Sequence, residues 1–276
     1  MSHAATELII EAGHTERNYW RDLFRYRELF YFLAWRDVLV RYKQTVIGVL
    51  WAVLRPLLTM VVFTFVFSRI AKLPAEGIPY PVMVFAAMLP WQLFATSLSE
   101  GSGSLINNAN LVSKVYFPRL IVPASAVIAS FVDFAISMVL LGVIMALYGV
   151  WPGAPILLLP VFTLLALLAS AGAGIWLAAL NVKYRDFRYV VPFIVQFGLY
   201  ISPVGFSSTI VPARWRFLYD FNPMVGVIDG FRWSVSHGRS PFPQQSLLLS
   251  LLTITILLAS GIWYFRKTER TFADVI

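Results

Sequence analysis

Residues 27–56, RELFYFLAWRDVLVRYKQTVIGVLWAVLRP, contain the change of pattern that decides the fold. Up to residue 44, a rotation of about 100° per residue places apolar side chains on one helical face and charged ones on the other. After Gln44 the charged face stops and a continuous apolar run begins. Aromatic groups at headgroup depth and basic groups near anionic lipid are typical of a helix on a membrane surface. The apolar face consists of Tyr31, Phe32, Trp35, Val38, Leu39 and Tyr42, and the opposite face of Arg36, Asp37, Arg41, Lys43 and Gln44, with Phe30, Leu33 and Val40 among them.

This stretch predicts an amphipathic interfacial helix over 27–44 that turns into a first membrane span. Two interpretations of the helix stay open. It is either a positive-inside anchor beside that span, or a cuff around the entrance of a conduit.

The composition excludes an ordinary soluble domain, because 59% of the residues are hydrophobic and only 13% are charged. A span needs about 20 apolar residues, so several fit in the chain. The absence of cysteine excludes disulfide and thiol chemistry, and the three scattered histidines predict no metal site. The net charge of +8 is assigned to basic residues at span ends, so no nucleic-acid partner is expected.

Six apolar segments predict an all-α integral membrane protein with spans at 46–70, 80–99, 120–148, 156–180, 190–206 and 245–264. Pro90 should bend the second span, and Pro192 and Pro203 should break the short fifth one. Small residues at 169–174 should let helix backbones approach closely. Residues 1–26 lack the pattern of a cleaved signal peptide and predict a flexible cytoplasmic segment. The transmembrane domain covers 45–265, and 266–276 form a cytoplasmic tail.

Three shorter helices are expected outside these spans. Glycines at 101 and 103 and Pro118 bound one on the inner side, near 104–116. Pro212 can open a second, and Asn222 with Pro223 can cap and open a third that Gly238 closes. The second and third are too short to cross, so they are either re-entrant outer helices or a packed outer cap.

The distribution of basic residues predicts the orientation. Most of them lie in the segments expected on the inner side, including the loop 181–189, whereas the short outer loops carry only Arg69 and Lys72. Both termini should therefore be cytoplasmic.

No nucleotide motif of the form Gly-x-x-x-x-Gly-Lys-Ser/Thr is present, and no nucleophile–His–acid arrangement stands out. The chain is therefore not expected to be an enzyme. If it transports a substrate with ATP, the ATPase must be another chain.

A set of short motifs then points to a family. They are Trp35-Arg36-Asp37, Arg41-Tyr42-Lys43-Gln44, Gly48 to Pro56, Lys114-Val115-Tyr116-Phe117-Pro118-Arg119, Tyr184-Arg185-Asp186 and Phe221-Asn222-Pro223. In this order and spacing, the chain from about residue 27 resembles the permease subunit of ABC transporters that export bacterial polysaccharides. It is most similar to the O-antigen and teichoic-acid type and less similar to capsule exporters, so the choice among these glycans stays open.

The resemblance implies a homodimer with two ATPase chains in the bacterial inner membrane. Those chains would hold ATP and Mg, this chain would hold no cofactor, and the complex would move a lipid-linked polysaccharide outward. The helix near 104–116 and the loop 181–189 would contact the ATPase through Asn107, Asn108, Asn110, Lys114, Tyr116, Tyr184, Arg185 and Asp186. The two short outer helices near 210–237 would be gate helices, with Phe217, Phe221, Asn222, Pro223 and Phe231.

If the resemblance holds, the anionic diphosphate of the substrate needs cations at the inner interface. The expected set is Arg25, Arg27, Arg36, Arg41 and Lys43, whose alternative role is to set topology and bind bulk membrane lipid. A bulky glycan also needs flat, weakly binding walls, which aromatic rings supply. The expected lining is Trp51, Phe63, Phe67, Phe197 and Tyr200. In the alternative interpretation, these side chains face lipid or the protein core.

Two charged residues lie inside expected spans, where an isolated charge is costly. Arg55 and Asp133 either pair with each other, or Arg55 meets the diphosphate partway along the path. Glu100, at a span end, either packs a helix against a loop or takes part in ATPase coupling.

Three other functions are weighed. An ATP-driven exporter of drugs or lipids fits the scaffold but does not explain the aromatic surface helix. A glycosyltransferase of envelope glycans should carry more outer acids than Glu76, Asp220 and Asp229. A secondary transporter should show a broken segment in two repeats, whereas one occurs only after the fifth span.

Overall fold

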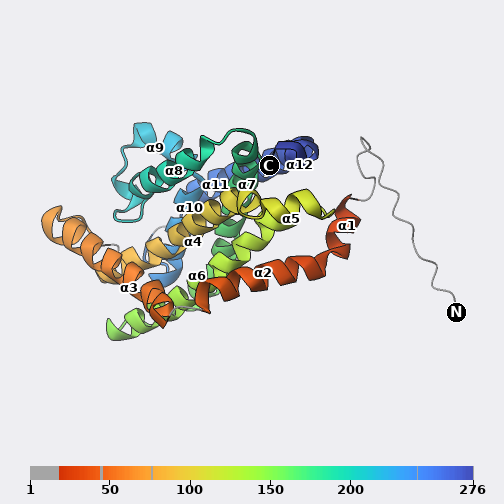
Figure 1. Ribbon diagram of the computed structural model, residues 1–276. Helices are drawn as coiled ribbons and strands as arrows, with labels where there is room; N and C mark the ends of the chain where they lie inside the picture. Colours follow the sequence, from red (N-terminus) through yellow and green to blue (C-terminus); the bar gives the residue numbers. More distant parts are fainter. Residues whose placement is uncertain (1–18, 44–45, 76, 241, 276) are drawn as a thin grey trace.

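The computed structural model describes residues 19–43, 46–75, 77–240 and 242–275, and within these ranges the chain is helical without a β-strand. Figure 1 shows the long helices gathered in a bundle, with α2 (Arg27–Tyr42) along one side of it. In chain order the elements are α1 (Tyr19–Arg25), α2 (Arg27–Tyr42), α3 (Val46–Phe63), η1 (Thr64–Ile70), α4 (Tyr80–Asn107), α5 (Ala109–Lys114), α6 (Ile121–Leu147), η2 (Ala154–Leu158), α7 (Leu159–Lys183), α8 (Phe187–Ile201), η3 (Ser208–Ile210), α9 (Ala213–Asp220), α10 (Pro223–Val235), α11 (Gln244–Thr268), η4 (Glu269–Thr271) and α12 (Phe272–Val275).

Five helical segments of the described chain are long and apolar enough to cross a membrane, so the protein is a multi-pass membrane protein. They are Leu50–Ile70, Tyr80–Asn107, Ile121–Leu147, Ala154–Lys183 and Gln244–Thr271. The fifth predicted span corresponds to α8, which has only 15 residues. It ends at Ile201 because Ser202 is extended and Pro203 follows.

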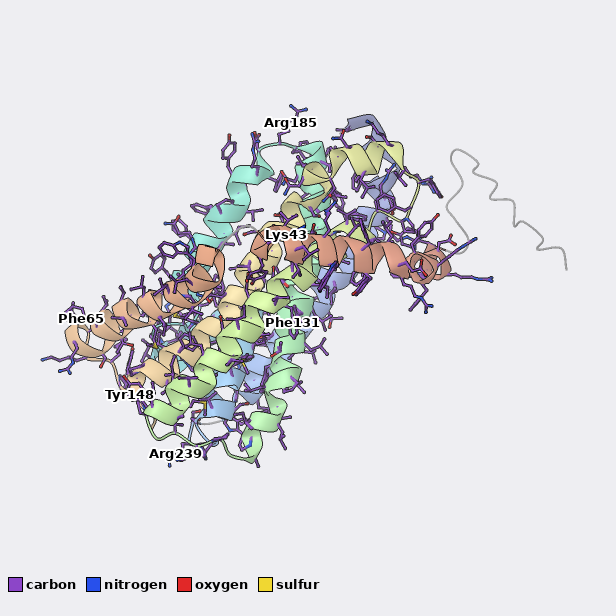
Figure 2. The ribbon with its side chains drawn as sticks, turned by 60° about the horizontal axis from the view of Figure 1, so that its bottom comes forward. Lys43, Phe65, Phe131, Tyr148, Arg185 and Arg239 are labelled. Atoms are coloured by element: carbon purple, nitrogen blue, oxygen red, sulfur yellow. The ribbon has the colours of Figure 1, made fainter. Side chains whose placement is uncertain are left out.

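Helix α4 forms the centre of the bundle. Its apolar window is 83% buried, and it packs against α6, α7 and α10, with α3 and α8 also in contact. The two ends of the bundle are separated in Figure 2, where Arg185 lies at one end and Tyr148 and Arg239 at the other. The loop between α7 and α8 and the loop after α10 are therefore on opposite sides.

The small residues predicted to allow close packing do so between α7 and α11. A methyl group added at Gly172 would lie 2.8 Å from the backbone nitrogen of Leu258, and one at Gly261 would lie 2.6 Å from the Gly172 carbonyl oxygen. Gly101 of α4 faces Gly174 of α7 at ordinary van der Waals distance, since a methyl group added at Gly101 would lie 3.9 Å from the Gly174 Cα. Since lipid supplies no hydrophobic force between helices, such close van der Waals contact stabilises the bundle.

The inner helix differs from its predicted extent. Helix α4 continues through the glycine-serine stretch to Asn107, and the separate helix α5 has six residues. The glycines do not end α4 because Gly101 lies against Gly174, and Ser102 and Ser104 donate to carbonyls of the preceding turn. Tight packing thus overrides the local preference of this stretch.

Both predicted tails are partly folded. Tyr19 is buried at the start of α1, donates to Glu269 and lies under the guanidinium of Arg266. Helix α11 continues to Thr268, after which α12 folds back and places Phe272 against Phe265. Part of the segment predicted to be flexible is therefore helical, at Tyr19–Arg25, whereas residues 1–18 lie outside the described residues. The tail at 266–275 is also helical.

The contact between α7 and α11 can be tested by one methyl group. Gly172→Ala places a Cβ against the backbone of α11 and should lower the free energy of unfolding by about 1–3 kcal/mol, as in other overpacked interiors. The measurement is thermal unfolding of the purified chain in detergent. Gly142→Ala is the matched control, because a methyl group there meets no atom within 4 Å. Equal stability of the two variants would contradict the assigned packing.

Candidate functional site

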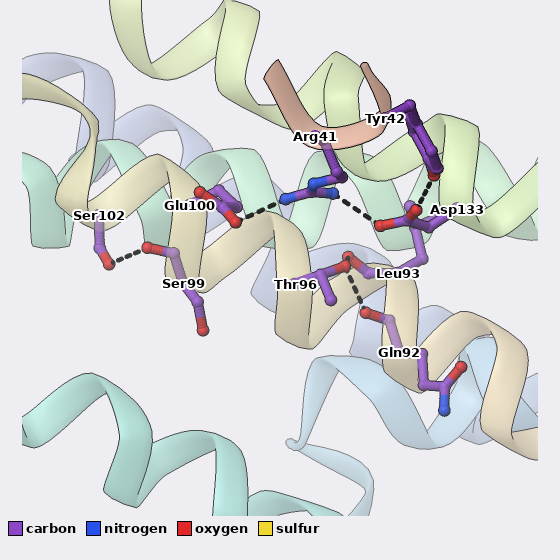
Figure 3. Close-up of polar contacts among 9 residues, drawn as sticks. All are labelled: Arg41, Tyr42, Gln92, Leu93, Thr96, Ser99, Glu100, Ser102 and Asp133. Carbon is purple, nitrogen blue, oxygen red and sulfur yellow. Dashed lines mark hydrogen bonds and ion pairs between the residues drawn. The ribbon is translucent and has the colours of Figure 1, made fainter. Parts of the chain in front are cut away.

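A charge cluster joins the end of α2 to the bundle. Arg41 donates from Nη1 to Asp133 on α6 and from Nη2 to Glu100 on α4, at 2.6 Å each, and Tyr42 donates to the second oxygen of Asp133 (Figure 3). Burial, followed by the hydrogen bond to Asp133 and the charge of that carboxylate, raises the pKa of Tyr42. The phenol therefore stays protonated and keeps its role as donor. The cluster fixes three elements to one another.

This cluster corrects the predicted pair of Arg55 and Asp133. The partner of Asp133 is Arg41, because α2 packs along α6 and brings its last turn to the level of that carboxylate. Arg55 is exposed on α3 and makes no ion pair with the described residues. Glu100 shares the Arg41 guanidinium, so its observed contact is an ion pair between α2 and α4.

Helix α2 directs part of its charged face toward the protein. Leu33 and Ala34 are buried against the bundle, and Arg36 and Arg41 are bonded to protein groups on the same side. Arg25, Arg27 and Lys43 are exposed (Lys43 is labelled in Figure 2). Of the five cations predicted to attract a headgroup, two are thus engaged with neighbouring helices in this structure.

The face of α2 that points away from the bundle carries an aromatic surface and a groove. Tyr31 and Trp35 stack with centroids 6.5 Å apart and planes within 6°. Beside them lies a groove of about 360 Å³ whose lining combines apolar side chains with two cations. The lining residues are Phe32, Trp35, Arg36, Leu39, Val40 and Lys43. The groove can accept an apolar chain with an anionic head.

Arg36 also contacts the joint between α4 and α5. Its Nη2 donates to Asn108 Oδ1 at 2.8 Å and to Asp37 Oδ1 at 2.7 Å, and its Nε donates to the same Asp37 oxygen at 3.0 Å. Asn108 lies between the last residue of α4 and the first of α5. A groove residue therefore reaches the base of the short inner helix.

The residues assigned to ATPase contact lie at one end of the bundle. Asn181 donates to the Ser102 carbonyl at 3.1 Å, so the ends of α4 and α7 are adjacent. Val112 and Phe117 anchor the α5 segment in a buried cluster. The predicted contact residues are exposed except Asn108, which is partly buried; the exposed ones are Asn107, Asn110, Lys114, Tyr116, Tyr184, Arg185 and Asp186. They form a polar surface around a rigid base.

The residues assigned to a conduit lie on three elements, α3, η1 and α8. Trp51 on α3 and Phe197 and Tyr200 on α8 are exposed, while Phe63 and Phe67 contact each other and are partly buried against the core. Helices α3 and α8 contact α4, on which each packs separately (Figure 1). Phe67 lies against Gly205, in the turn that follows α8, so η1 approaches the end of that helix.

The outer helices have the predicted local structure. Pro212 precedes α9, and the Asn222 side chain accepts from the Met224 amide at 3.0 Å with Pro223 at the first position of α10. Phe217 and Phe221 are exposed, and their rings contact edge to face. Phe231, in contrast, is buried against Phe134 and Phe162, so it packs α10 onto the core.

Arg232 on α10 was not identified from the sequence. It is 1% exposed and donates to the carbonyls of Phe206 at 2.7 Å and Val204 at 3.1 Å. It therefore holds the turn after α8 against α10. An arginine within an apolar helical segment was the available signal, because such a cation is buried only with partners.

Among the described residues, no group of three or more His, Asp or Glu side chains is placed to hold a metal ion. The polar groups named above instead bind helices to one another or face outward.

The Arg41 cluster predicts a specific coupling between mutations. Arg41→Ala leaves Asp133 without its cation and should destabilise the chain more than Arg41→Ala combined with Asp133→Asn. The coupling energy should be about 0.5–3 kcal/mol, read from thermal unfolding of the four proteins of the cycle. Arg55→Ala with Asp133→Asn is the control cycle and should be additive. Coupling in the control but not with Arg41 would restore the original pairing.

Comparison with known proteins identifies the family. The family model described as ABC-2 type transporter matches residues 28–235. The O-antigen export system permease protein RfbA of Myxococcus xanthus is 31% identical over 93% of this chain and 98% of its own length. A protein of the same name from Klebsiella pneumoniae is 27% identical over 87% of this chain and 92% of its own length. The polysialic acid transport protein KpsM of Escherichia coli is 21% identical over 85% of this chain and 91% of its own length. The resemblance seen in the sequence is confirmed, and the chain belongs to the ABC-2 type transporter family.

Proposed function

We propose that this chain is the permease subunit of an ATP-driven exporter that moves a lipid-linked polysaccharide of O-antigen type across the bacterial inner membrane. The observation that carries the proposal is similarity along nearly the whole chain to O-antigen export permeases. The aromatic surface of α2 and the groove beside it add support, because a drug exporter has no need of an interfacial site with paired cations.

The proposed topology has six crossings and two cytoplasmic termini. Helix α8 supplies the sixth crossing with a length of about 22 Å, which is short for a bilayer core of about 30 Å. Helices α9 and α10 continue from it and complete the outer half as re-entrant elements. The burial of α10 against α4, α7 and α11 supports this arrangement, because backbone at membrane depth must be covered by protein.

The proposed assembly is a homodimer with two ATPase chains. The polar surface around α5 and the 184–186 turn is the docking site, since its side chains point away from a buried anchor at one end of the bundle. ATP and Mg belong to the partner chains. Binding and hydrolysis there would move α5, and α5 would pass the movement to α4, which contacts α3, α6, α7, α8 and α10.

The conduit is proposed to form between two copies. Trp51, Phe197 and Tyr200 expose about half or more of their area in a single chain, on helices that contact α4 separately. A second copy facing α3 and α8 would bring such surfaces into one wall. Arg55 is exposed on the same helix as Trp51 and would meet the diphosphate partway along the path.

The proposal is tested by expressing the tagged chain with its natural operon and purifying it in mild detergent. An ATP-binding partner should co-purify in equal amount, and deletion of the chain should leave the polysaccharide inside the cell. Lys114→Glu combined with Arg185→Glu reverses charge on the exposed docking surface and should reduce the bound partner about tenfold or more, as for a loss of about 1.4 kcal/mol.

The matched control is Arg214→Glu with Arg239→Glu, which makes the same charge change at exposed positions of the outer segment. These substitutions should leave the partner bound. Normal surface polysaccharide in the deletion strain, or a purified chain without an ATPase, would reject the proposed function.

A further inference from the structure

Arg36 takes part in two features of the protein, the groove on α2 and the joint between α4 and α5. It lies on the stripe Phe32, Arg36, Leu39 and Lys43, which follows helical spacing and lines the groove on α2. Its guanidinium also bonds Asn108, 72 residues later in the chain. A ligand in the groove and the α4–α5 joint therefore compete for one side chain.

Asn108 is the hinge residue of that joint. Its backbone amide and its side-chain amide both donate to the Ser104 carbonyl, at 3.1 and 2.9 Å, and so end α4. Its own carbonyl accepts from the amides of Leu111 and Val112, at 2.9 and 3.0 Å, and so begins α5. Because the Asn108 side-chain oxygen accepts from Arg36, the orientation of this residue depends on where the guanidinium points.

The hydrogen bonds of Arg36 leave a defined way to bind an anion. Nε and Nη2 both donate to Asp37, Nη2 also donates to Asn108, and Nη1 makes no hydrogen bond with a described residue. A phosphate prefers two parallel bonds from one guanidinium. Nη1 and Nη2 can supply that fork only when Nη2 leaves Asn108, while Nε can stay on Asp37.

The competition favours the phosphate. A phosphate is charged and can accept two parallel bonds from the guanidinium, whereas the side-chain oxygen of Asn108 is neutral and accepts one. Lys43 lies seven residues from Arg36, about 10 Å along the helix, and lines the same groove. A diphosphate ester carries two negative charges and matches these two cations, whereas an ordinary phospholipid phosphate carries one.

We propose that Arg36 and Asn108 form a substrate sensor, in which the diphosphate head of the transported lipid draws the Arg36 guanidinium off Asn108 and thereby releases the α4–α5 joint. The inference rests on the proposed function and adds a regulatory step to it. An empty groove holds α5 in its resting orientation. An occupied groove frees α5 to respond to the ATPase, so hydrolysis follows loading of the inner leaflet.

The test uses the complex of this chain with its co-purified ATPase in phosphatidylcholine nanodiscs. The probe is a polyprenyl diphosphate that carries one sugar, measured both by binding of its radiolabelled form and by its effect on ATP hydrolysis. The wild-type complex should bind the probe and hydrolyse ATP faster with it. Lys43→Ala removes one groove cation and should weaken binding of the probe about tenfold.

Two substitutions at Asn108 should have opposite effects. Asn108→Ala removes the acceptor but leaves the groove intact, so binding should persist and hydrolysis should be fast even without probe. Asn108→Asp gives Arg36 an ionised partner, so about tenfold more probe should be needed for the same stimulation. Size-exclusion profiles and retained ATPase identify variants that remain assembled.

Three results would overturn the sensor. In the first, both Asn108 variants respond to the probe as the wild type does. In the second, the wild type binds the probe without any change in hydrolysis. In the third, phosphatidylglycerol alone produces the full stimulation, which would assign the groove to bulk anionic lipid. None of these affects co-purification of the ATPase or the export phenotype of the deletion strain, so failure of the sensor is separable from failure of the proposed function.

Discussion

Close backbone contact between α7 and α11 is the constraint on which the bundle depends. In a bilayer, apolar side chains gain little by leaving lipid, so helices associate through tight packing and polar contacts. The glycines of α4, α7 and α11 allow that approach, and Gly101 and Gly174 bring the inner ends of α4 and α7 together. Because α4 is enclosed by other helices along its length, a movement at either of its ends must be taken up by the whole bundle.

The polar contacts fix the elements that packing alone leaves free. Helix α2 buries few residues, and its position depends on Arg41, which bridges Asp133 and Glu100 on two different helices. At the opposite side, Arg232 holds the turn after α8 through two carbonyls. These bonds add directional contacts to the packing of α2 along α6 and of α10 against α4, α7 and α11.

The sequence predicts the features that follow from composition and local chemistry. Five of the six predicted spans coincide with helices long and apolar enough to cross a membrane, and the Asn222-Pro223 pair correctly opens α10. Prediction from the sequence fails where tertiary contacts decide where a helix ends or which charges pair. Gly101 reads as a helix end but lies inside α4 because Gly174 faces it, and Asp133 takes Arg41 because α2 runs along α6. Neither neighbour can be identified from spacing along the chain.

The charged face of α2 is a second case in which spacing along the chain does not identify the bonded neighbours, and here the difference bears on function. Alternation of apolar and basic residues predicts a helix that offers its cations to lipid, yet Arg36 and Arg41 are bonded to the protein. The two bonds differ in strength, because Arg41 meets two carboxylates whereas Arg36 shares Nη2 between a carboxylate and a neutral amide. A phosphate can displace the Asn108 side-chain oxygen from Arg36, but it cannot displace the two carboxylates from Arg41. Arg41 therefore serves as the fixed attachment of α2, and Arg36 is the contact that a ligand in the groove can change.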